Sequence, residues 1–451
     1  MFYFIFFIIL IILLTIYNHH KDNKSLKILT IIYCTITFLI TIFLPDAYVI
    51  SYEDNELTHS FKDTLYALIR WFSSINFIIL PISVFYNNKI IKSLAHYFSL
   101  TITIISILFY PVHLEYYTSP LGRGLNSIDI ISTSFKQLLL NPILRTIIQS
   151  IVWLLELTII INIKNYKLEK QETKKFILTL LFIIFSSIPI YVPQHLFGYT
   201  NIIFDKWTIP HILWLLTILL IIITLNTIFK NKSKESKEIL CMILSLSLFI
   251  QYNQMFTAIS MNIKRLPLQL CNIGAYLILI SLITKNKKIF NFTLIVNVIG
   301  VLFALLMPDL DGKGLFYLYN MHFIFEHTNI LIIPILALSL GLFPKLDKKS
   351  LKDCLLGFTI YFITVLLLGT LFNGLALITN NSFYEANYLF MFDKKVATNF
   401  FKPFGLLFNK QIQIGHFIFY PLIQSIVYLT FITLCTLLYF IIKLIYKICK
   451  V

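Results

Sequence analysis

A thiol and two imidazoles lie in stretches of this sequence that are apolar enough to be surrounded by lipid. Cys271 closes the string Leu-Pro-Leu-Gln-Leu-Cys at 266–271, and His322 and His327 follow in a later apolar segment. Polar groups inside a bilayer are energetically costly and usually mark function. A Cys with a His is the minimal pair for nucleophilic acyl chemistry, because the imidazole takes the thiol proton and later returns it to the leaving group.

The composition places the chain among membrane proteins. Of its 451 residues, 58% are hydrophobic and only 13% are charged. The net charge of +16 does not indicate a nucleic-acid partner, because the basic residues lie between hydrophobic runs and do not form one water-exposed stripe. The six Cys are scattered and predict neither a disulfide framework nor a metal site. No nucleotide-binding loop or His-Glu-x-x-His motif is present, so no cofactor is predicted.

Hydropathy predicts an all-α, polytopic membrane protein with about 13 transmembrane helices, since a span needs about 20 apolar residues. The predicted spans lie near 2–18, 28–46, 64–86, 93–112, 137–163, 176–194, 208–229, 239–258, 266–284, 289–307, 317–343, 353–378 and 412–442. Alternate connections carry clusters of lysines, among them 230–237, 285–288 and 345–352. Because basic connections stay on the cytoplasmic side, we expect the N-terminus outside and the C-terminus inside. The predicted location is the cell membrane.

The spans divide into two predicted regions. Residues 1–200 would form a six-helix membrane region, and residues 204–451 a seven-helix membrane domain. The first six spans and the next six enter the membrane with the same polarity, as a parallel duplication requires. A weak similarity between 65–70 and 266–271 would make the first region a degenerate repeat, with Arg70 in the place of Cys271. Chance similarity among Ile-rich helices is the alternative.

The predicted orientation brings polar residues to a common depth in the outer half of the membrane. At about 1.5 Å per residue, Cys271 lies about 8 Å and His327 about 15 Å below the outer ends of their helices. His322 and Glu326 are four residues apart and share a helix face. His211, Gln251, Asn253, Asn272 and Asn373 are predicted in the same half. Polar side chains at one depth on several helices usually face a shared cavity.

Each of these residues also has a structural interpretation. A single Cys in an apolar helix is most often a small hydrophobic residue. His322 and Glu326 would neutralise each other between helices, and Asn373 would bridge two helices. His211, at the start of a helix, would be an interfacial residue.

Several motifs between residues 204 and 451 occur in a specific order. They are Leu-Pro-Leu-Gln-Leu-Cys at 266–271, His322-Phe323, Glu326-His327 with Pro334 after it, Trp207 to His211, and Asn387-Tyr388-Leu389-Phe390. Together they resemble the YwaF family of bacterial integral membrane proteins. That family is similar to an animal transmembrane acyltransferase that moves fatty acyl chains between phospholipids with a Cys nucleophile. More distantly, it is similar to membrane hydrolases of fatty-acid esters.

The resemblance implies roles for particular residues. Cys271 would be the nucleophile and His327 the general base, while His322, Asn373, Asn387 and Tyr388 match family positions without assigned roles. Gln269 stands where the family usually has His, which removes any proton-relay role there. Residues 1–200 resemble nothing in that family.

Three functions therefore remain open. The leading hypothesis is a lipid acyltransferase or lipid-ester hydrolase that uses Cys271 and His327, with membrane lipids as partners. The second is a transporter or channel, in which Glu326 and the His residues act as a relay. The third is a non-catalytic membrane scaffold. The sequence does not specify an oligomeric state.

Overall fold

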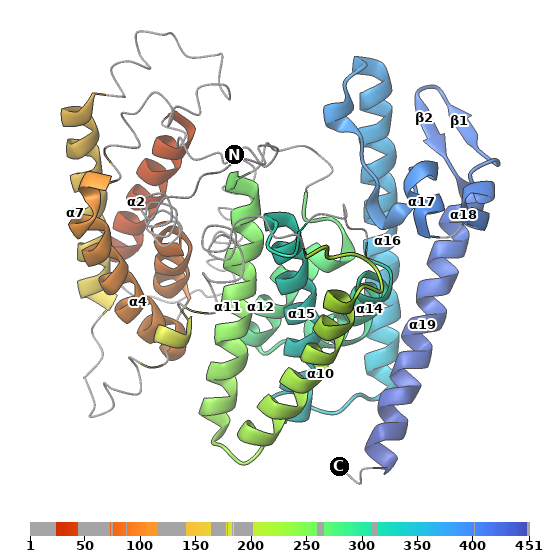
Figure 1. The fold of residues 1–451 in the computed structure, drawn as a ribbon, viewed down its shortest axis with the longest axis horizontal. Helices are drawn as coiled ribbons and strands as arrows, with labels where there is room; N and C mark the ends of the chain where they lie inside the picture. Colours follow the sequence, from red (N-terminus) through yellow and green to blue (C-terminus); the bar gives the residue numbers. More distant parts are fainter. Residues whose placement is uncertain are drawn as a thin grey trace. The chain divides into compact units, whose positions relative to one another are not determined.

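The computed structural model describes residues 24–43, 75–86, 88–112, 141–163, 179–182, 202–258, 266–308, 314–400 and 402–448, together with Ser73, Leu114, Ile177 and Ile184. Within these ranges the chain is almost entirely helical (Figure 1). Its contacts divide it into two compact units. The first unit is mainly residues 1–201, and the second is most of the chain from Ile202 onward.

The first unit contains α2 (Lys24–Phe43), a helix over Ile75–Phe85, α4 (Lys89–Leu108) and α7 (Pro142–Ile163). The helices α2 and α4 both pack against α7. Asn88 begins α4, because its side chain accepts hydrogen bonds from the amides of Ile90 and Ile91. Asn141 caps α7 in the same way, with Pro142 at the first helical position.

The second unit is a longer series of helices with a small hairpin. Its elements are α10 (Ile209–Phe229), α11 (Lys234–Ala258), α12 (Leu270–Thr284), α13 (Lys287–Phe292), η3 (Thr293–Asn297), α14 (Val298–Leu306), α15 (Leu318–Ser339), α16 (Lys348–Thr379), η4 (Ser382–Tyr384), η5 (Tyr388–Phe390), α17 (Lys394–Phe400), α18 (Lys402–Leu407), β1 (Ile412–Ile414), β2 (Phe417–Phe419) and α19 (Pro421–Ile448). The strands β1 and β2 pair antiparallel. The last residues of α11 and the first of α15 cluster with the other unit.

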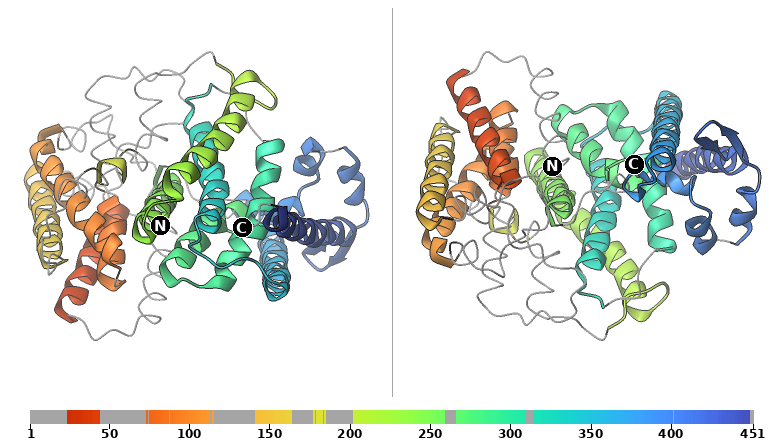
Figure 2. Two further views of the ribbon diagram at one scale, coloured as in Figure 1. Left: turned by 90° about the horizontal axis from the view of Figure 1, so that it is seen from below. Right: turned by 90° about the horizontal axis from the view of Figure 1, so that it is seen from above.

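The helices α16 and α19 lie side by side, as both views of Figure 2 show. Phe358 of α16 stacks on Tyr428 and Phe431 of α19, with ring centroids 5.9 and 5.1 Å apart. Aromatic contacts of this kind add to the stabilisation from apolar burial. These contacts pack α16 against α19.

Small residues let α12 approach the continuous run α13–η3–α14 closely. A Cβ on Gly274 would lie 3.1 Å from Asn297 Nδ2, and a Cβ on Gly300 would lie 2.8 Å from Leu270 Cδ2. Helices in membranes pack tightly through such small residues. The beginning of α12 is therefore pressed against η3 and α14.

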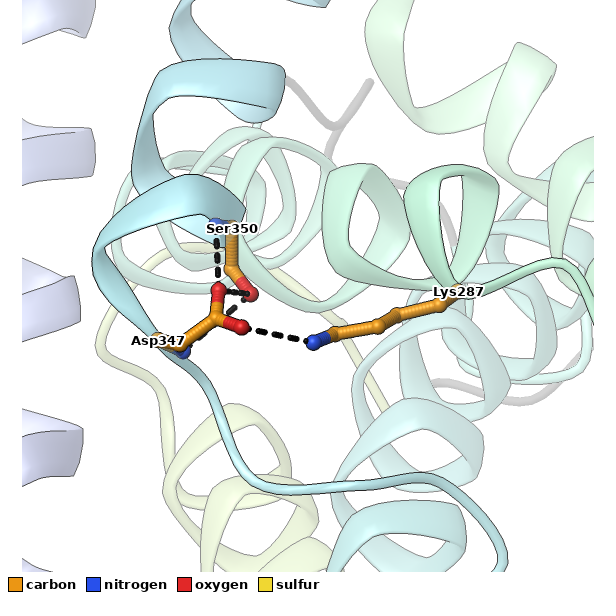
Figure 3. Close-up of polar contacts among 3 residues, drawn as sticks. All are labelled: Lys287, Asp347 and Ser350. Atoms are coloured by element: carbon orange, nitrogen blue, oxygen red, sulfur yellow. Dashed lines mark hydrogen bonds and ion pairs between the residues drawn. The ribbon is translucent and has the colours of Figure 1, made fainter.

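An exposed ionic contact ties the beginning of α13 to the beginning of α16 (Figure 3). Lys287 Nζ lies 2.9 Å from Asp347 Oδ2, and Asp347 Oδ1 accepts from the Ser350 amide at 2.7 Å. The Ser350 hydroxyl also donates to Asp347, which completes the N-terminal cap of α16. These bonds to Ser350, followed by the Lys287 charge, lower the pKa of Asp347 well below its usual range.

Among the described residues, seven helices are long and apolar enough to cross a membrane: α4, α7, α10, the run from α13 to α14, α15, α16 and α19. The chain is thus an integral, multi-pass membrane protein. The Ile75–Phe85 helix and α12 are shorter apolar helices. The predicted span at 2–18 and most of that at 176–194 lie outside the described residues, as does Arg70. The total of 13 spans, the orientation and the division into domains stay predictions.

The last predicted span began too early. Residues 412–419 form the hairpin, and the helix starts only at Pro421. Gly415 makes the turn with φ of +61°, a conformation that other residues rarely adopt. Gln413 alternates with exposed Ile412 and Ile414, so this segment had the apolar content of a span but the period of a strand.

Candidate functional site

Cys271 follows a tight turn at the start of α12. Residues 266–269 form the turn, Gln269 is the N-cap, and Cys271 is the second helical residue. The amides of a first helical turn have no partner within the helix and carry partial positive charge. The half-buried thiol of Cys271 therefore lies where a developing negative charge is stabilised.

Side chains from two other elements bind the backbone of this turn. The Tyr361 hydroxyl of α16 donates to the Leu268 carbonyl at 2.7 Å. Asn297, the last residue of the π-helical turn η3, donates through Nδ2 to the Leu270 carbonyl at 2.5 Å. Single π turns within α-helices are frequent at functional sites. The two bonds fix the carbonyls on both sides of Gln269, two residues before the thiol.

Gln269 joins the turn to a distant loop. Its Nε2 donates to the Asn387 carbonyl at 2.8 Å, and its Oε1 accepts from the Leu389 amide at 3.1 Å. The Gln269 amide thus donates one hydrogen bond and accepts another, both with backbone groups of the loop. A proton-relay His would need its ring nitrogens for proton transfer instead. In this chain, residue 269 acts as a clamp between the start of α12 and the loop 386–392.

The loop 386–392 holds an unusual backbone conformation. Leu389 and Phe390 have φ of 52° and 56°, in the left-handed region that is unfavourable for residues other than Gly. Tyr388 between the clamp residues is completely buried. Consecutive strained residues persist only where the surroundings hold them, and they cluster at active sites and ligand clamps.

Asn373 and Asn387 supply part of that support. Asn373 of α16 forms two hydrogen bonds with the backbone of Ala386, both of 2.9 Å. Asn387 Oδ1 accepts from the Phe392 amide at 3.1 Å. A Cβ on Gly369 would lie 2.4 Å from the Phe392 ring, so the absence of a side chain at Gly369 leaves room for this loop. The two Asn residues are supports of the loop in this structure.

Polar groups surround the thiol of Cys271. Its Sγ donates to Asn272 Oδ1 at 3.1 Å. The carboxyl of Glu326 on α15 interacts electrostatically with both Cys271 and the Tyr252 hydroxyl of α11. Tyr361 interacts with Cys271 as well. The thiol thus lies at a point where α11, α12, α15 and α16 all present polar groups.

His327 is buried on α15, directly after Glu326. Its Nδ1 lies 2.8 Å from the Phe323 carbonyl, and its ring lies against the Phe323 ring with centroids 4.1 Å apart. A carbonyl only accepts, so Nδ1 carries the hydrogen, and in the neutral ring Nε2 has the lone pair. His322, five residues earlier on α15, is also buried. The pairing of Cys271 with His327 stays a prediction.

His211 is fully buried and fastens the start of α10. Its Nδ1 accepts from the Trp207 amide at 3.1 Å, and its Nε2 lies 2.9 Å from the Leu305 carbonyl of α14. With both ring nitrogens bonded to backbone groups, His211 supports the fold around the site.

Sequence reasoning missed three residues near Cys271: Tyr252, Asn297 and Tyr361. Tyr361 binds a carbonyl 93 positions away, so no local pattern identifies it. Asn297 lies within a predicted span, and its polarity there was the one available signal.

Comparison with known families matches residues 203–439 to the TMEM164 family, which is more than half of the chain. This chain belongs to the TMEM164 family. Comparisons with curated proteins and with solved structures gave no match. The expected relation to YwaF and to acyltransferases stays a prediction. The segment matching the TMEM164 family includes the Cys271 turn, Glu326, His327 and the loop 386–392, whereas residues 1–202 lie outside it.

Within the described part of this TMEM164-family chain, no three His, Cys, Asp or Glu side chains gather as metal ligands. The chemistry that the site offers is that of a thiol, an imidazole, a carboxyl and hydrogen-bond donors.

Proposed function

We propose that this protein is a membrane acyltransferase or lipid-ester hydrolase with Cys271 as its nucleophile. One observation carries the proposal: the turn before Cys271 is fixed by Tyr361, Asn297 and Gln269, and Gln269 in turn holds a strained loop. A small apolar residue at position 271 would need no such support. A nucleophile does need it, because catalysis depends on groups held close to their reactive geometry.

In the proposed first step, the Cys271 sulfur attacks the carbonyl carbon of a lipid ester. The thiol proton passes to Nε2 of His327, which then donates it to the departing alkoxide oxygen, so that an alcohol leaves and a thioester remains. In the second step, water or the hydroxyl of an acceptor lipid attacks the thioester carbonyl. His327 takes the proton of the attacking group and returns it to the thiol.

The carboxyl of Glu326 constrains this scheme. Cys271 lies in apolar surroundings beside this carboxyl, and a charged sulfur is costly there. The thiol therefore loses its proton during the attack, as in general-base catalysis. This distinguishes the proposed site from enzymes that keep a preformed thiolate.

The oxyanion of the tetrahedral intermediate would be stabilised by backbone amides. The amides of Cys271 and Asn272 lie beside the thiol at the start of α12. Asn373 is not proposed as an oxyanion donor, because both ends of its amide are bonded to the Ala386 backbone. Donors held in place before the reaction stabilise the developing charge most effectively.

Labelling with a lipid-like thiol probe tests the proposal in full-length protein in detergent. We expect the wild type and Cys354→Ser to react and Cys271→Ser to lose labelling while it unfolds at the wild-type temperature. Cys354 is a suitable control because it is fully buried on α16. Labelling that persists in Cys271→Ser contradicts the proposal.

A further inference from the structure

A buried carboxylate in the first unit lies at the centre of a polar cluster that the proposed acyl chemistry does not use. Glu156 of α7 is 4% exposed, and Tyr33, Asn76 and Thr103 around it are each at most 1% exposed. These residues come from α2, the Ile75–Phe85 helix and α4. Four helices thus present polar side chains to one carboxyl group inside an apolar bundle.

The hydrogen bonds of the cluster run toward the carboxylate. The Tyr33 hydroxyl donates to Glu156 Oε1 and the Thr103 hydroxyl donates to Oε2, both at 2.9 Å. Asn76 Nδ2 donates to the Thr103 hydroxyl oxygen at 3.3 Å, and the Asn76 side chain also reaches the Glu156 carboxyl. Every donor in the cluster is committed, and one acceptor, Asn76 Oδ1, is buried without a partner.

Among the described residues, the groups bonded to this carboxyl are neutral hydroxyls and an amide. Arg145, the basic residue on the same helix, lies eleven residues earlier, which is about 16 Å along the axis. His96 of α4 lies against α7 one turn beyond Glu156, with its Nδ1 3.1 Å from the Ile160 carbonyl. On α2, Cys34 neighbours Tyr33. An ionised carboxylate without a directly paired cation is very costly in such an environment.

We propose that Glu156 is a proton-binding site within the membrane. One hydrogen on its carboxyl removes the net charge and supplies the donor that Asn76 Oδ1 lacks, so that a Glu156 O–H to Asn76 Oδ1 bond completes the cluster. The ligand is a proton, and the residues of the site all precede residue 203, where the segment that matches the family begins. Protonatable carboxyls of this kind are the groups through which membrane proteins take up and release protons.

Infrared difference spectroscopy of the full-length protein in lipid nanodiscs tests this inference. At neutral pH and without sodium, the wild type should show the carbonyl stretching band of a protonated, hydrogen-bonded carboxylic acid. Glu156→Gln should lose the band, and Glu235→Gln should keep it, because Glu235 is an exposed residue at the start of α11. Thr103→Val should retain the band at a shifted frequency, since it removes one hydrogen bond but not the acid. That variant also keeps the test decisive if Glu156→Gln does not fold.

Two results would overturn the inference. One is a neutral-pH spectrum in which no carboxylic acid band is lost in Glu156→Gln or shifted in Thr103→Val. The other is a band that addition of sodium chloride at constant pH converts to a carboxylate band, which would make the cluster a site for a metal cation instead.

Discussion

At the scale of single residues, the position of Gln269 explains much of the site. The resemblance to the YwaF family implies a missing histidine at this position, but in the structure the Gln269 amide connects the Cys271 turn to the Asn387 carbonyl and the Leu389 amide. Residue 269 therefore bears on the geometry of the nucleophile. The absence of a histidine at position 269 is therefore compatible with the proposed role of the Cys271 thiol.

Replacing Gln269 by Leu should destabilise the protein. The substitution leaves the Leu389 amide and the Asn387 carbonyl without partners, and each such buried group costs about 1–3 kcal/mol of the free energy of unfolding. Thermal unfolding in detergent measures the effect. Gln413→Leu on the exposed hairpin is the control, and equal unfolding temperatures for the two variants would contradict the clamp.

Replacing Tyr361 by Phe tests its positioning role. The change removes only the hydroxyl that binds the Leu268 carbonyl, so stability should fall by about 0.5–1.5 kcal/mol. If the turn positions the nucleophile, kcat should fall about tenfold with little change in KM. Tyr428→Phe, whose hydroxyl bonds Thr359 on the same pair of helices, should leave kcat unchanged. A loss that appears only in KM would argue against positioning.

At the scale of elements, α16 is the support on which the site is built. It supplies Tyr361 to the Cys271 turn and Asn373 to the loop 386–392. The N-terminal end of α16 is capped by Asp347, which also binds Lys287 at the start of α13. The run from α13 leads to Asn297, so this exposed contact joins the two elements that hold the turn.

The cap at Asp347 should make stability depend on pH. The folded-state pKa is lowered, so the stabilisation is fully present above the unfolded-state value of about 3.9 and is lost as the pH falls through the lower folded-state value. Asp347→Asn should therefore unfold at a lower temperature than the wild type at pH 7, and the difference should shrink in acid. Asp353→Asn, further along α16, is the matched control. A difference that stays constant down to strongly acidic pH would exclude this linkage.

At the scale of the whole molecule, the apolar runs predicted the membrane-spanning helices well where lysines flank them, as for α10 and α16. The hairpin at 412–419 was missed because its exposed isoleucines extended the following apolar run. The contacts of Tyr361, Gln269 and Asn297 were beyond sequence reasoning for another reason. Each contact joins a side chain to a backbone group far along the chain. Every residue type has a backbone carbonyl, so the sequence does not indicate which carbonyl a side chain will bind.

The lysine pattern predicts on which side of the membrane each end of the helices lies. Single cysteines at Lys232, in the turn between α10 and α11, and at Gln413, in the hairpin, should behave oppositely with an impermeant maleimide. We expect intact cells to label the cysteine at 413 and only permeabilised cells to label that at 232. The reverse pattern would invert the orientation and place the Cys271 turn on the cytoplasmic side.

The most direct test of the proposed chemistry is mass spectrometry of the acylated protein. Full-length protein in vesicles of phospholipid with a tagged acyl chain should acquire the tag on Cys271, as an adduct that hydroxylamine removes. His327→Ala should acquire it far more slowly, Cys271→Ser should not acquire it, and Cys354→Ser should match the wild type. Lipid turnover that proceeds equally in Cys271→Ser, or a tag that never appears on Cys271, would contradict the account.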